Sequence, residues 1–463
     1  MSIDRRNFLS QTATGIGGIA AMNLLNAGAT GAPSFRPKAK RVIQLFMNGG
    51  ASQMDLFDYK PRLAELDGKK FDPGEGQHVE ASASVPGNVM KSPFSFAQHG
   101  QCGRWMSDQL PHLSKHVDEM AFLMAMTSKS NVHGPAAYLQ TSGFFLPGFP
   151  SAGSWISYAL GSLSENVPAF VALPDDRGLP YNGRSAFTSG FLPANHEGTV
   201  VHADKPRPIT HLEPPETAKH ITRESRAEGL SLLNDFNATH AAQRPGDSRL
   251  NARIESYQLA ARLQLAAPEL LDLSRESAVT KNKYGLDHPD TENFGRRCLL
   301  ARRMIERGVR FVQVWSGYGG ARNNWDNHAS IPKELPPITR GMDQPTAALL
   351  TDLKQRGLLE DTLLVWTTEF GRMPFSQNNV GRDHNGGTFV NWFAGAGIRK
   401  GAAFGQSDEW SWKAVKDATN TYDFHATILH LLGLDHEQLS VRHGGIDRRL
   451  TDVHGHILHD ILS

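Results

Sequence analysis

The chain has 463 residues, of which 39% are hydrophobic and 21% charged, a composition typical of a folded globular protein. Its 48 basic and 47 acidic residues leave a net charge of +1, which gives no electrostatic reason to expect nucleic acid or an anionic membrane as a partner. With two cysteines, Cys102 and Cys298, disulfides cannot be the main source of stability.

The first residues have the order of an export signal. Arg5 and Arg6 begin the sequence RRNFL, which matches the core of the twin-arginine pattern. An uncharged stretch rich in Gly, Ala and Leu follows from Thr12 to Leu25, and Ala27-Gly28-Ala29 offers a small-residue cleavage site. We therefore expect residues 1–29 to be a twin-arginine signal peptide and the folded protein to be exported, to the periplasm or the outside. The alternative is a cytosolic N-terminal helix with an incidental pair of arginines.

The uncharged stretch is too short and too rich in glycine to be a convincing membrane span. No later segment reaches the length of one. We therefore expect no integral membrane segment in the mature chain.

Strand and helix patterns alternate along the rest of the chain. Apolar runs predict buried strands at residues 41–47, 120–126, 168–174, 309–315, 362–367 and 389–394. Apolar residues spaced by three or four, with turn signals, predict helices at 131–143, 153–160, 294–308, 342–356, 422–434 and 453–462. This order predicts an α/β fold with a mostly parallel sheet and helices on both faces.

Two further features of the helices can be predicted. Long polar helices at about 214–290 indicate an insertion packed beside the sheet, within a single domain from residue 40 to 463. The helix at 294–308 carries five arginines, which we interpret as its solvated face rather than a binding patch: Arg296, Arg297, Arg302, Arg303 and Arg307.

Charged residues gather after the predicted strand at 362–367. Glu369 and Arg372 follow it directly, and Arg382, Asp383 and His384 come together a short way beyond, in a glycine-rich loop. Open α/β sheets keep their chemistry at such strand ends. We interpret the loop as a metal or anion site; the alternative is a salt-bridged surface loop, since loops favour Gly, Asn and Asp in any case.

Three other segments offer ligands at the same edge of the sheet. The strand at 41–47 ends in Asn48 and two glycines, with Asp55 close behind. Asp326 and His328 follow the strand at 309–315 and supply one carboxylate and one imidazole, ligands suited to zinc, manganese or iron. His133 opens a helix after a buried strand, a place that favours anions.

Taken together, these motifs resemble a known family. The twin-arginine start is followed in order by MNGGASQMDLFD, PSAGSWISYALGS, FVALPD, WDNHAS, TTEFGR, GRDHNGG and RLTDVHGHIL. In this they are similar to the exported bacterial family catalogued as domain of unknown function 1501, and the likeness covers nearly the whole mature chain. The family belongs by resemblance to the alkaline phosphatase and sulfatase superfamily, which implies a three-layer sandwich.

The resemblance implies a metal site. Known superfamily members hold one or two divalent cations with acids and histidines at the carboxyl edge of the sheet. The cations activate a nucleophile that attacks a phosphate or sulfate ester.

Asn48 occupies the position where the superfamily usually has its first metal-binding Asp, so Asp55 is a possible substitute. Asp326 and His328 resemble the Asp and His of one metal, and His384 resembles the His of a phosphatase His-x-Gly. Glu369 keeps the carboxylate of an Asp-His pair, and Asp383 completes the predicted ligands. Zinc is expected first, with manganese or calcium as alternatives.

The nucleophile departs from the superfamily pattern. Sulfatases place it ten residues before a Gly that closes the same helix, and here His133 stands ten residues before Gly143. Either His133 attacks the ester itself, or it ligates a metal while metal-activated water attacks, which asks less of the site. Arg372 or Arg382 could bind the remaining ester oxygens.

Two functions fit these residues. The first is a metal-dependent hydrolase of phosphate or sulfate esters, acting on an anionic small molecule or a sulfated or phosphorylated glycan. The second is a non-catalytic exported protein that uses the same cleft to bind an anionic glycan or a protein partner, because fold alone does not decide function.

Overall fold

The computed structural model describes residues 33–463 apart from 73, 75–76, 80–85, 211, 213–216, 219–221, 245–247 and 321–322. The expected signal peptide at residues 1–29 lies outside the described residues. Within those ranges, no helix combines the length and hydropathy needed to cross a membrane.

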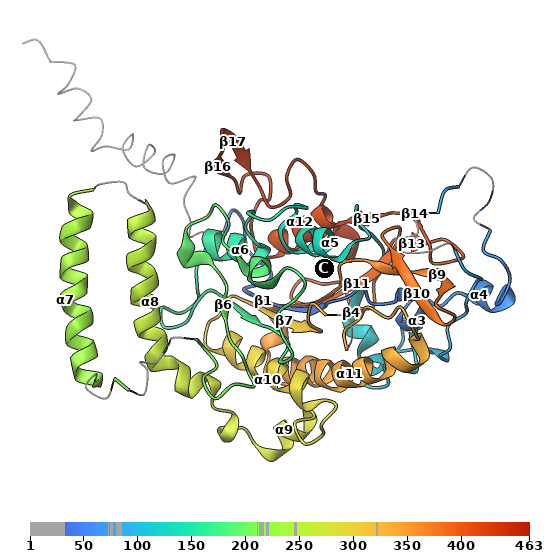
Figure 1. The fold of residues 1–463 in the computed structure, drawn as a ribbon, viewed down its shortest axis with the longest axis horizontal. Helices are drawn as coiled ribbons and strands as arrows, with labels where there is room; N and C mark the ends of the chain where they lie inside the picture. The colour runs from blue at the N-terminus through green and yellow to red at the C-terminus, as the bar shows by residue number, and fades with distance from the viewer. Residues whose placement is uncertain are drawn as a thin grey trace, which may run out of the picture.

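A central sheet of nine strands, counted over the described residues, runs through the molecule (Figure 1). Its order is β12-β4-β11-β8-β1-β7-β5-β6, and β15 also pairs with β4. The strands are β1 (Arg41–Met47), β4 (Met120–Thr127), β5 (Phe170–Leu173), β6 (Thr199–Val200), β7 (Phe311–Ser316), β8 (Thr362–Thr367), β11 (Phe389–Gly395), β12 (Ala403–Phe404) and β15 (Thr419–Asn420).

The sheet is mostly parallel, as predicted. β1 pairs in parallel with both β7 and β8, and β5 pairs in parallel with β6 and β7. β11 is the exception, antiparallel to β4 and β8. It follows β8 through a hairpin, β9 (Gly371–Gln377) and β10 (Gly381–Asn385), without the crossover helix that a parallel return needs. The carboxyl ends of β1, β4, β7 and β8 therefore share one edge.

Helices cover both faces of the sheet and make three layers (Figure 1). On one face lie α5 (His133–Ser142), α6 (Ala152–Leu160) and α12 (Thr421–Leu431), and on the other α10 (Glu292–Glu306) and α11 (Ile331–Gln355). Alternation along β1 feeds both cores: Val42 and Phe46 join the cluster with α6 and α12, while Ile43 and Leu45 join the cluster with α10 and α11. The predicted three-layer α/β class is confirmed.

Two long helices occupy the stretch predicted as an insertion. α7 (Arg223–Ala242) and α8 (Ser248–Leu271) stand side by side at one end of the molecule, away from the sheet (Figure 1). The lower end of α8 leads back to the body, and α9 (Ala278–Lys283) follows before α10.

Two predicted helix boundaries were wrong. α11 begins at Ile331 instead of 342, although Pro336, Pro337 and Pro345 lie inside it. The helix predicted at 453–462 is absent there apart from a short 3-10 turn, η6 (His459–Ile461). Side chains of α12 bind the backbone of that segment: Asp423 accepts from the amide of His456 at 2.8 Å, and Thr427 from the amide of Leu458 at 3.0 Å. These amides are therefore satisfied without a helix.

The arginine face predicted on α10 was wrong for two of its members. Arg297 and Arg302 are each only 2% exposed. Arg297 lies 3.5 Å from Asp175, and Arg302 lies 2.7 Å from Glu276 and 3.0 Å from Asp352. Acidic groups on other elements therefore compensate the buried charges.

Candidate metal centre

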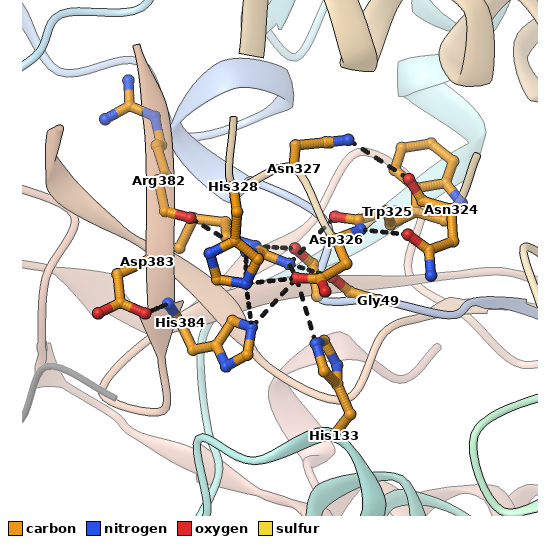
Figure 2. Close-up of polar contacts among 12 residues, drawn as sticks. Gly49, His133, Asn324, Trp325, Asp326, Asn327, His328, Arg382, Asp383 and His384 are labelled. Atoms are coloured by element: carbon orange, nitrogen blue, oxygen red, sulfur yellow. Dashed lines mark hydrogen bonds and ion pairs between the residues drawn. The ribbon is translucent and has the colours of Figure 1, made fainter. Parts of the chain in front are cut away.

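Four side chains from three separate segments converge at the carboxyl edge of the sheet (Figure 2). His133 is the first residue of α5, Asp326 and His328 lie on the loop after β7, and His384 lies on β10. One ligand atom from each lies within 4.8 Å of all the others. The four were predicted as site residues, and the structure brings them together.

Three of the four ligand atoms form a tight triangle. Asp326 Oδ1 lies 2.7 Å from His328 Nε2 and 3.1 Å from His384 Nε2. The two Nε2 atoms are 2.7 Å apart. His133 is attached to this triangle through Asp326 Oδ1, 3.2 Å from its Nε2, without a hydrogen bond of acceptable geometry.

Each of the three imidazole rings directs Nε2 toward the cluster, and its Nδ1 forms a hydrogen bond with an oxygen atom on the side away from the cluster. His384 Nδ1 donates to the backbone oxygen of Asn131 at 2.8 Å, and His133 Nδ1 donates to Glu369 Oε1 at 2.7 Å. His328 Nδ1 pairs with Gln377 Oε1. A carbonyl oxygen can only accept, so the proton of a neutral ring sits on Nδ1 and the lone pair of Nε2 points into the cluster.

Burial and charge set the protonation of these groups. Burial lowers the pKa of His384 to about 4, and the nearby Arg372 adds to this, so the ring is neutral near pH 7. Burial also opposes the charge on His133, but its contacts with the carboxylates of Asp326 and Glu369 outweigh this effect and raise its pKa. For Asp326, burial would raise the pKa, but Arg372 and the three histidines together hold it well below its usual range.

The donor set fits a divalent cation. The Nε2 atoms of His328 and His384 lie 2.7 Å apart, and each lies within 3.1 Å of Asp326 Oδ1. Because oxygen atoms contact Nδ1 of both rings, a cation among these three atoms would receive the lone pairs of the two Nε2 atoms. Two imidazoles and one carboxylate are the ligands of many zinc and manganese sites.

The turn of the β9–β10 hairpin helps to place His328 and His384. Asn378 and Asn379 have φ values of 50° and 77°, a left-handed conformation that asparagine tolerates. The hairpin puts Gln377 at the end of β9, where it contacts His328. It also places His384, on β10, opposite Arg372, on β9. The charged segment predicted as a loop is therefore mostly paired strand.

Arg372 stabilises the cluster from the buried side, and its guanidinium is not exposed to bind a substrate. Its side chain is fully buried, and it donates to Asp326 Oδ1 at 2.7 Å. Its guanidinium also donates to the backbone oxygens of Gly49, Gly50, Trp325 and Arg382, and Nη1 lies 3.5 Å from His328 Nε2. The predicted role in binding ester oxygens is incompatible with these contacts.

Arg382 and Asp55 form a buried ion pair away from the cluster. Arg382 Nε lies 2.7 Å from Asp55 Oδ2, and Nη2 lies 3.1 Å from Oδ1. Both side chains are fully buried, and Figure 2 shows the Arg382 guanidinium directed away from the histidines. The predicted roles of Arg382 as an anion ligand and Asp55 as a metal ligand are therefore not supported, because each neutralises the other.

Glu369 and Asp383 also stand outside the triangle. Glu369 is fully buried, and its Oε1 accepts from the Gly49 amide at 2.8 Å as well as from His133. It orients His133 instead of serving as the predicted ligand. Asp383 Oδ1 accepts from the amide of His384 at 2.8 Å, and its carboxylate points away from the cluster in Figure 2.

Sequence reasoning missed three residues of the site. Gln377 and Asn131 hold His328 and His384, and a hairpin prediction from the asparagine turn could have found Gln377. Tyr181 stacks on His133 with ring centroids 4.2 Å apart, and its hydroxyl lies 3.5 Å from Asp326 Oδ2. Burial, with the charges of Asp326 and Glu369, raises the pKa of Tyr181, so its hydroxyl keeps its proton. No local pattern marks this tyrosine.

A comparison with protein families decides the relationship. The family described as "Protein of unknown function (DUF1501)" matches residues 39–462. The chain belongs to this family. The DUF1501 resemblance read from the motifs is thereby confirmed. No curated protein matches the chain.

Solved structures similar to this DUF1501 chain include three enzymes. The PsFucS1 sulfatase from Pseudoalteromonas sp. is 13% identical, with 90% of this chain and 71% of that one covered and a TM-score of 0.36. The lipoteichoic acid synthase LtaP from Listeria monocytogenes is 9% identical, with 94% and 80% covered and a TM-score of 0.36. The alkaline phosphatase from the Antarctic bacterium TAB5 is 10% identical, with 86% and 99% covered and a TM-score of 0.33.

Proposed function

We propose that the protein is a metal-dependent hydrolase of phosphate or sulfate esters. One observation carries the proposal: Asp326 Oδ1 and the Nε2 atoms of His328 and His384 lie within 3.1 Å of one another, in a group that could hold a metal ion. One carboxylate and two imidazoles at these short distances suit a divalent cation.

Asp326, His328 and His384 would hold the cation. Their three ligand atoms form the triangle, and three protein ligands leave a coordination position open, as in catalytic sites. Imidazole nitrogens favour zinc or manganese over calcium, which prefers oxygen ligands. When bound, the cation supplies Lewis acidity, which polarises an ester oxygen and makes water a stronger nucleophile.

His133 is placed to act as the general base. Glu369 fixes its Nδ1 proton and directs Nε2 toward the cluster, while Tyr181 stacks on the ring and limits its rotation. With His328 and His384 as ligands, His133 is the imidazole of the four-residue cluster that is left to accept a proton. In this role Nε2 takes the proton of the attacking water, and no nucleophilic Ser or Thr is required.

The start of α5 favours an anionic substrate. α5 has ten residues and begins at His133, and Val132 at its N-cap offers no side-chain oxygen to the first amides. The partial positive charge of these amides would attract ester oxygens to the position beside His133. We propose an anionic small molecule or a sulfated or phosphorylated glycan as the substrate, and an exported protein as its location.

The test is hydrolysis of a panel of activated phosphate, phosphonate and sulfate esters by the protein loaded with zinc or manganese. His133→Gln should lower the rate by at least about 100-fold, the scale of a positioned base, while metal content stays at the wild-type level. Loss of metal in this variant would make His133 a ligand instead of a base. If the metal-loaded wild type cleaves none of the esters, the hydrolase proposal fails, and binding of acidic polysaccharide becomes the function to test.

A further inference from the structure

A cavity lies beside the candidate metal centre. It encloses about 390 Å³, within the range of small-molecule sites, which runs from roughly 300 to 1,000 Å³. Its wall combines residues before His133, residues after His384, the neighbours Trp412 and Lys413, and two single residues, His78 and Met373.

The cavity and the metal centre share structural elements. Asn131 lines the cavity, and its backbone oxygen holds Nδ1 of His384 at 2.8 Å. Asn385 is the neighbour of His384 on β10, and its side chain donates to the backbone oxygen of Trp412 at 2.9 Å. The same two segments therefore line the cavity and hold His384 in the cluster.

The described part of the cavity wall carries positive charge. Lys129 and Lys413 line it, and none of the wall residues that the structure describes is Asp or Glu. Within the described part of the chain, neither lysine forms an ion pair; Lys129 Nζ lies 4.8 Å from the Tyr422 ring centre and Lys413 Nζ lies 4.1 Å from that of Trp412. Lys413 also donates to Gln77 Oε1 at 2.7 Å. Two cations held over aromatic rings in a polar cavity suit an anion.

We propose that this cavity binds a second anionic group of the substrate, so that the preferred substrate is a glycan with at least two sulfate or phosphate groups. Asp326, His328 and His384 would hold the group that is cleaved through the cation, and Lys129 and Lys413 bind the group on a neighbouring sugar. Hydroxyl and amide groups of the wall, such as those of Ser128 and Ser130, suit sugar hydroxyls. The description of the ligand as a substrate rests on the hydrolase proposal; the anion site itself does not.

The experiment measures binding, so that it is independent of turnover. Isothermal titration compares a disulfated disaccharide, its monosulfated counterpart and the diphosphorylated equivalent, on mature protein carrying His133→Gln to prevent cleavage. The disulfated sugar should bind at least about tenfold more tightly than the monosulfated sugar, as expected for one further charge-assisted contact of about 1.4 kcal/mol or more. The diphosphorylated sugar tells whether the cavity prefers sulfate or phosphate.

Adding Lys129→Gln and Lys413→Gln to the His133→Gln protein should make its affinities for the disulfated and the monosulfated sugar nearly equal, so that their ratio is close to one. Lys333→Gln, at an exposed lysine of α11, removes charge elsewhere and should leave the ratio unchanged. Equal binding of the two sulfated sugars by the parent protein, or an unchanged ratio in the double lysine variant, would overturn the proposal. Selective binding of the disulfated sugar without turnover by wild type would support the anion site and reject the hydrolase proposal. Turnover by wild type without selective binding would support the hydrolase proposal and reject the anion site.

Discussion

Glu369, at the end of β8, accepts a hydrogen bond of 2.7 Å from Nδ1 of His133, the first residue of α5. The carboxylate is fully buried and also holds the amide of Gly49. The contact therefore joins three segments of the chain and fixes both the orientation of the His133 ring and the nitrogen that keeps its proton.

Replacing that carboxylate should weaken the base without removing the metal. Glu369→Gln removes a charge that raises the pKa of His133, so the pKa should fall and the acidic limb of the pH–rate profile should move to lower pH. Hydrolysis should fall about 10- to 100-fold, the usual cost of losing a residue that orients such a ring. The measurements are kcat across pH and metal content. A variant that loses its metal would show that Glu369 is a ligand after all.

Removing a histidine of the triangle should remove the metal itself. His328→Ala and His384→Ala each delete one of the three ligand atoms, an Nε2 that contacts Asp326 Oδ1. Elemental analysis should therefore find that most of the metal is lost. His456→Ala, at an exposed histidine, is the matched control and should retain it. Wild-type metal content in both triangle variants would contradict the site, as would wild-type protein that carries no stoichiometric metal after purification without chelator.

The Asp55–Arg382 pair should matter for stability and not for the metal. Asp55→Ala leaves the Arg382 guanidinium buried without its partner, at a cost of about 3–5 kcal/mol in the free energy of unfolding. Urea unfolding monitored by circular dichroism gives this value, with Asp460→Ala at an exposed position as control. The folded fraction should keep its metal. A stable variant without metal would restore Asp55 as a ligand.

His425 should make the protein less stable in acid. Burial lowers the pKa of this α12 residue from 6.5 to about 4, and its Nε2 lies 3.1 Å from the backbone oxygen of Gln140. Between these pH values the unfolded chain binds a proton that the folded chain does not, so stability falls as pH falls from 6.5 toward 4, by up to about 1.4 kcal/mol per pH unit. Above pH 6.5 this contribution is constant.

The effect can be isolated by comparing unfolding of wild type and His425→Gln at several pH values. The difference in unfolding free energy between the two proteins should shift against wild type as the solution becomes more acidic. His456→Gln, at an exposed histidine, should show no such shift. A difference that is independent of pH would mean that His425 titrates normally in the folded protein.

Export should depend on the two N-terminal arginines. Replacing Arg5 and Arg6 with lysine keeps the charge but removes the guanidinium pair of the RRNFL sequence, so precursor should accumulate in the cytoplasm. Cell fractionation and immunoblotting measure this. Unchanged export of the lysine variant would contradict the twin-arginine route.

Local sequence pattern predicted the strands that build the site. Continuous apolar runs mark β1, β7 and β8, because strands buried on both faces have no polar side to show. The charged residues directly behind those runs could therefore be assigned to one edge of the sheet. Asp326 and His328 were found in this way, and His133 and His384 by the motifs around them.

What could not be predicted depends on contacts between distant segments. Nothing near Arg382 in sequence indicates that Asp55 neutralises it, and nothing near Arg302 indicates the acids that allow its burial. The same is true of the failed C-terminal helix, whose amides are bound by side chains of α12. Its carboxylate and its place just after β8 made Glu369 a candidate ligand; the position of His133 makes it the orienting residue.

The Arg372 brace bears on when the site can form during synthesis. Arg372 binds the backbone of Gly49, which is 323 residues earlier in the chain, and the backbone of Trp325 and Arg382. His384 follows on β10, close to the C-terminal part of the fold. A nascent chain that ends before β10 lacks His384 and the strand that pairs with β9, whose last residue, Gln377, contacts His328. A metal ion held by this site would therefore be acquired only after β10 has been made, and a shorter truncated product could not retain it.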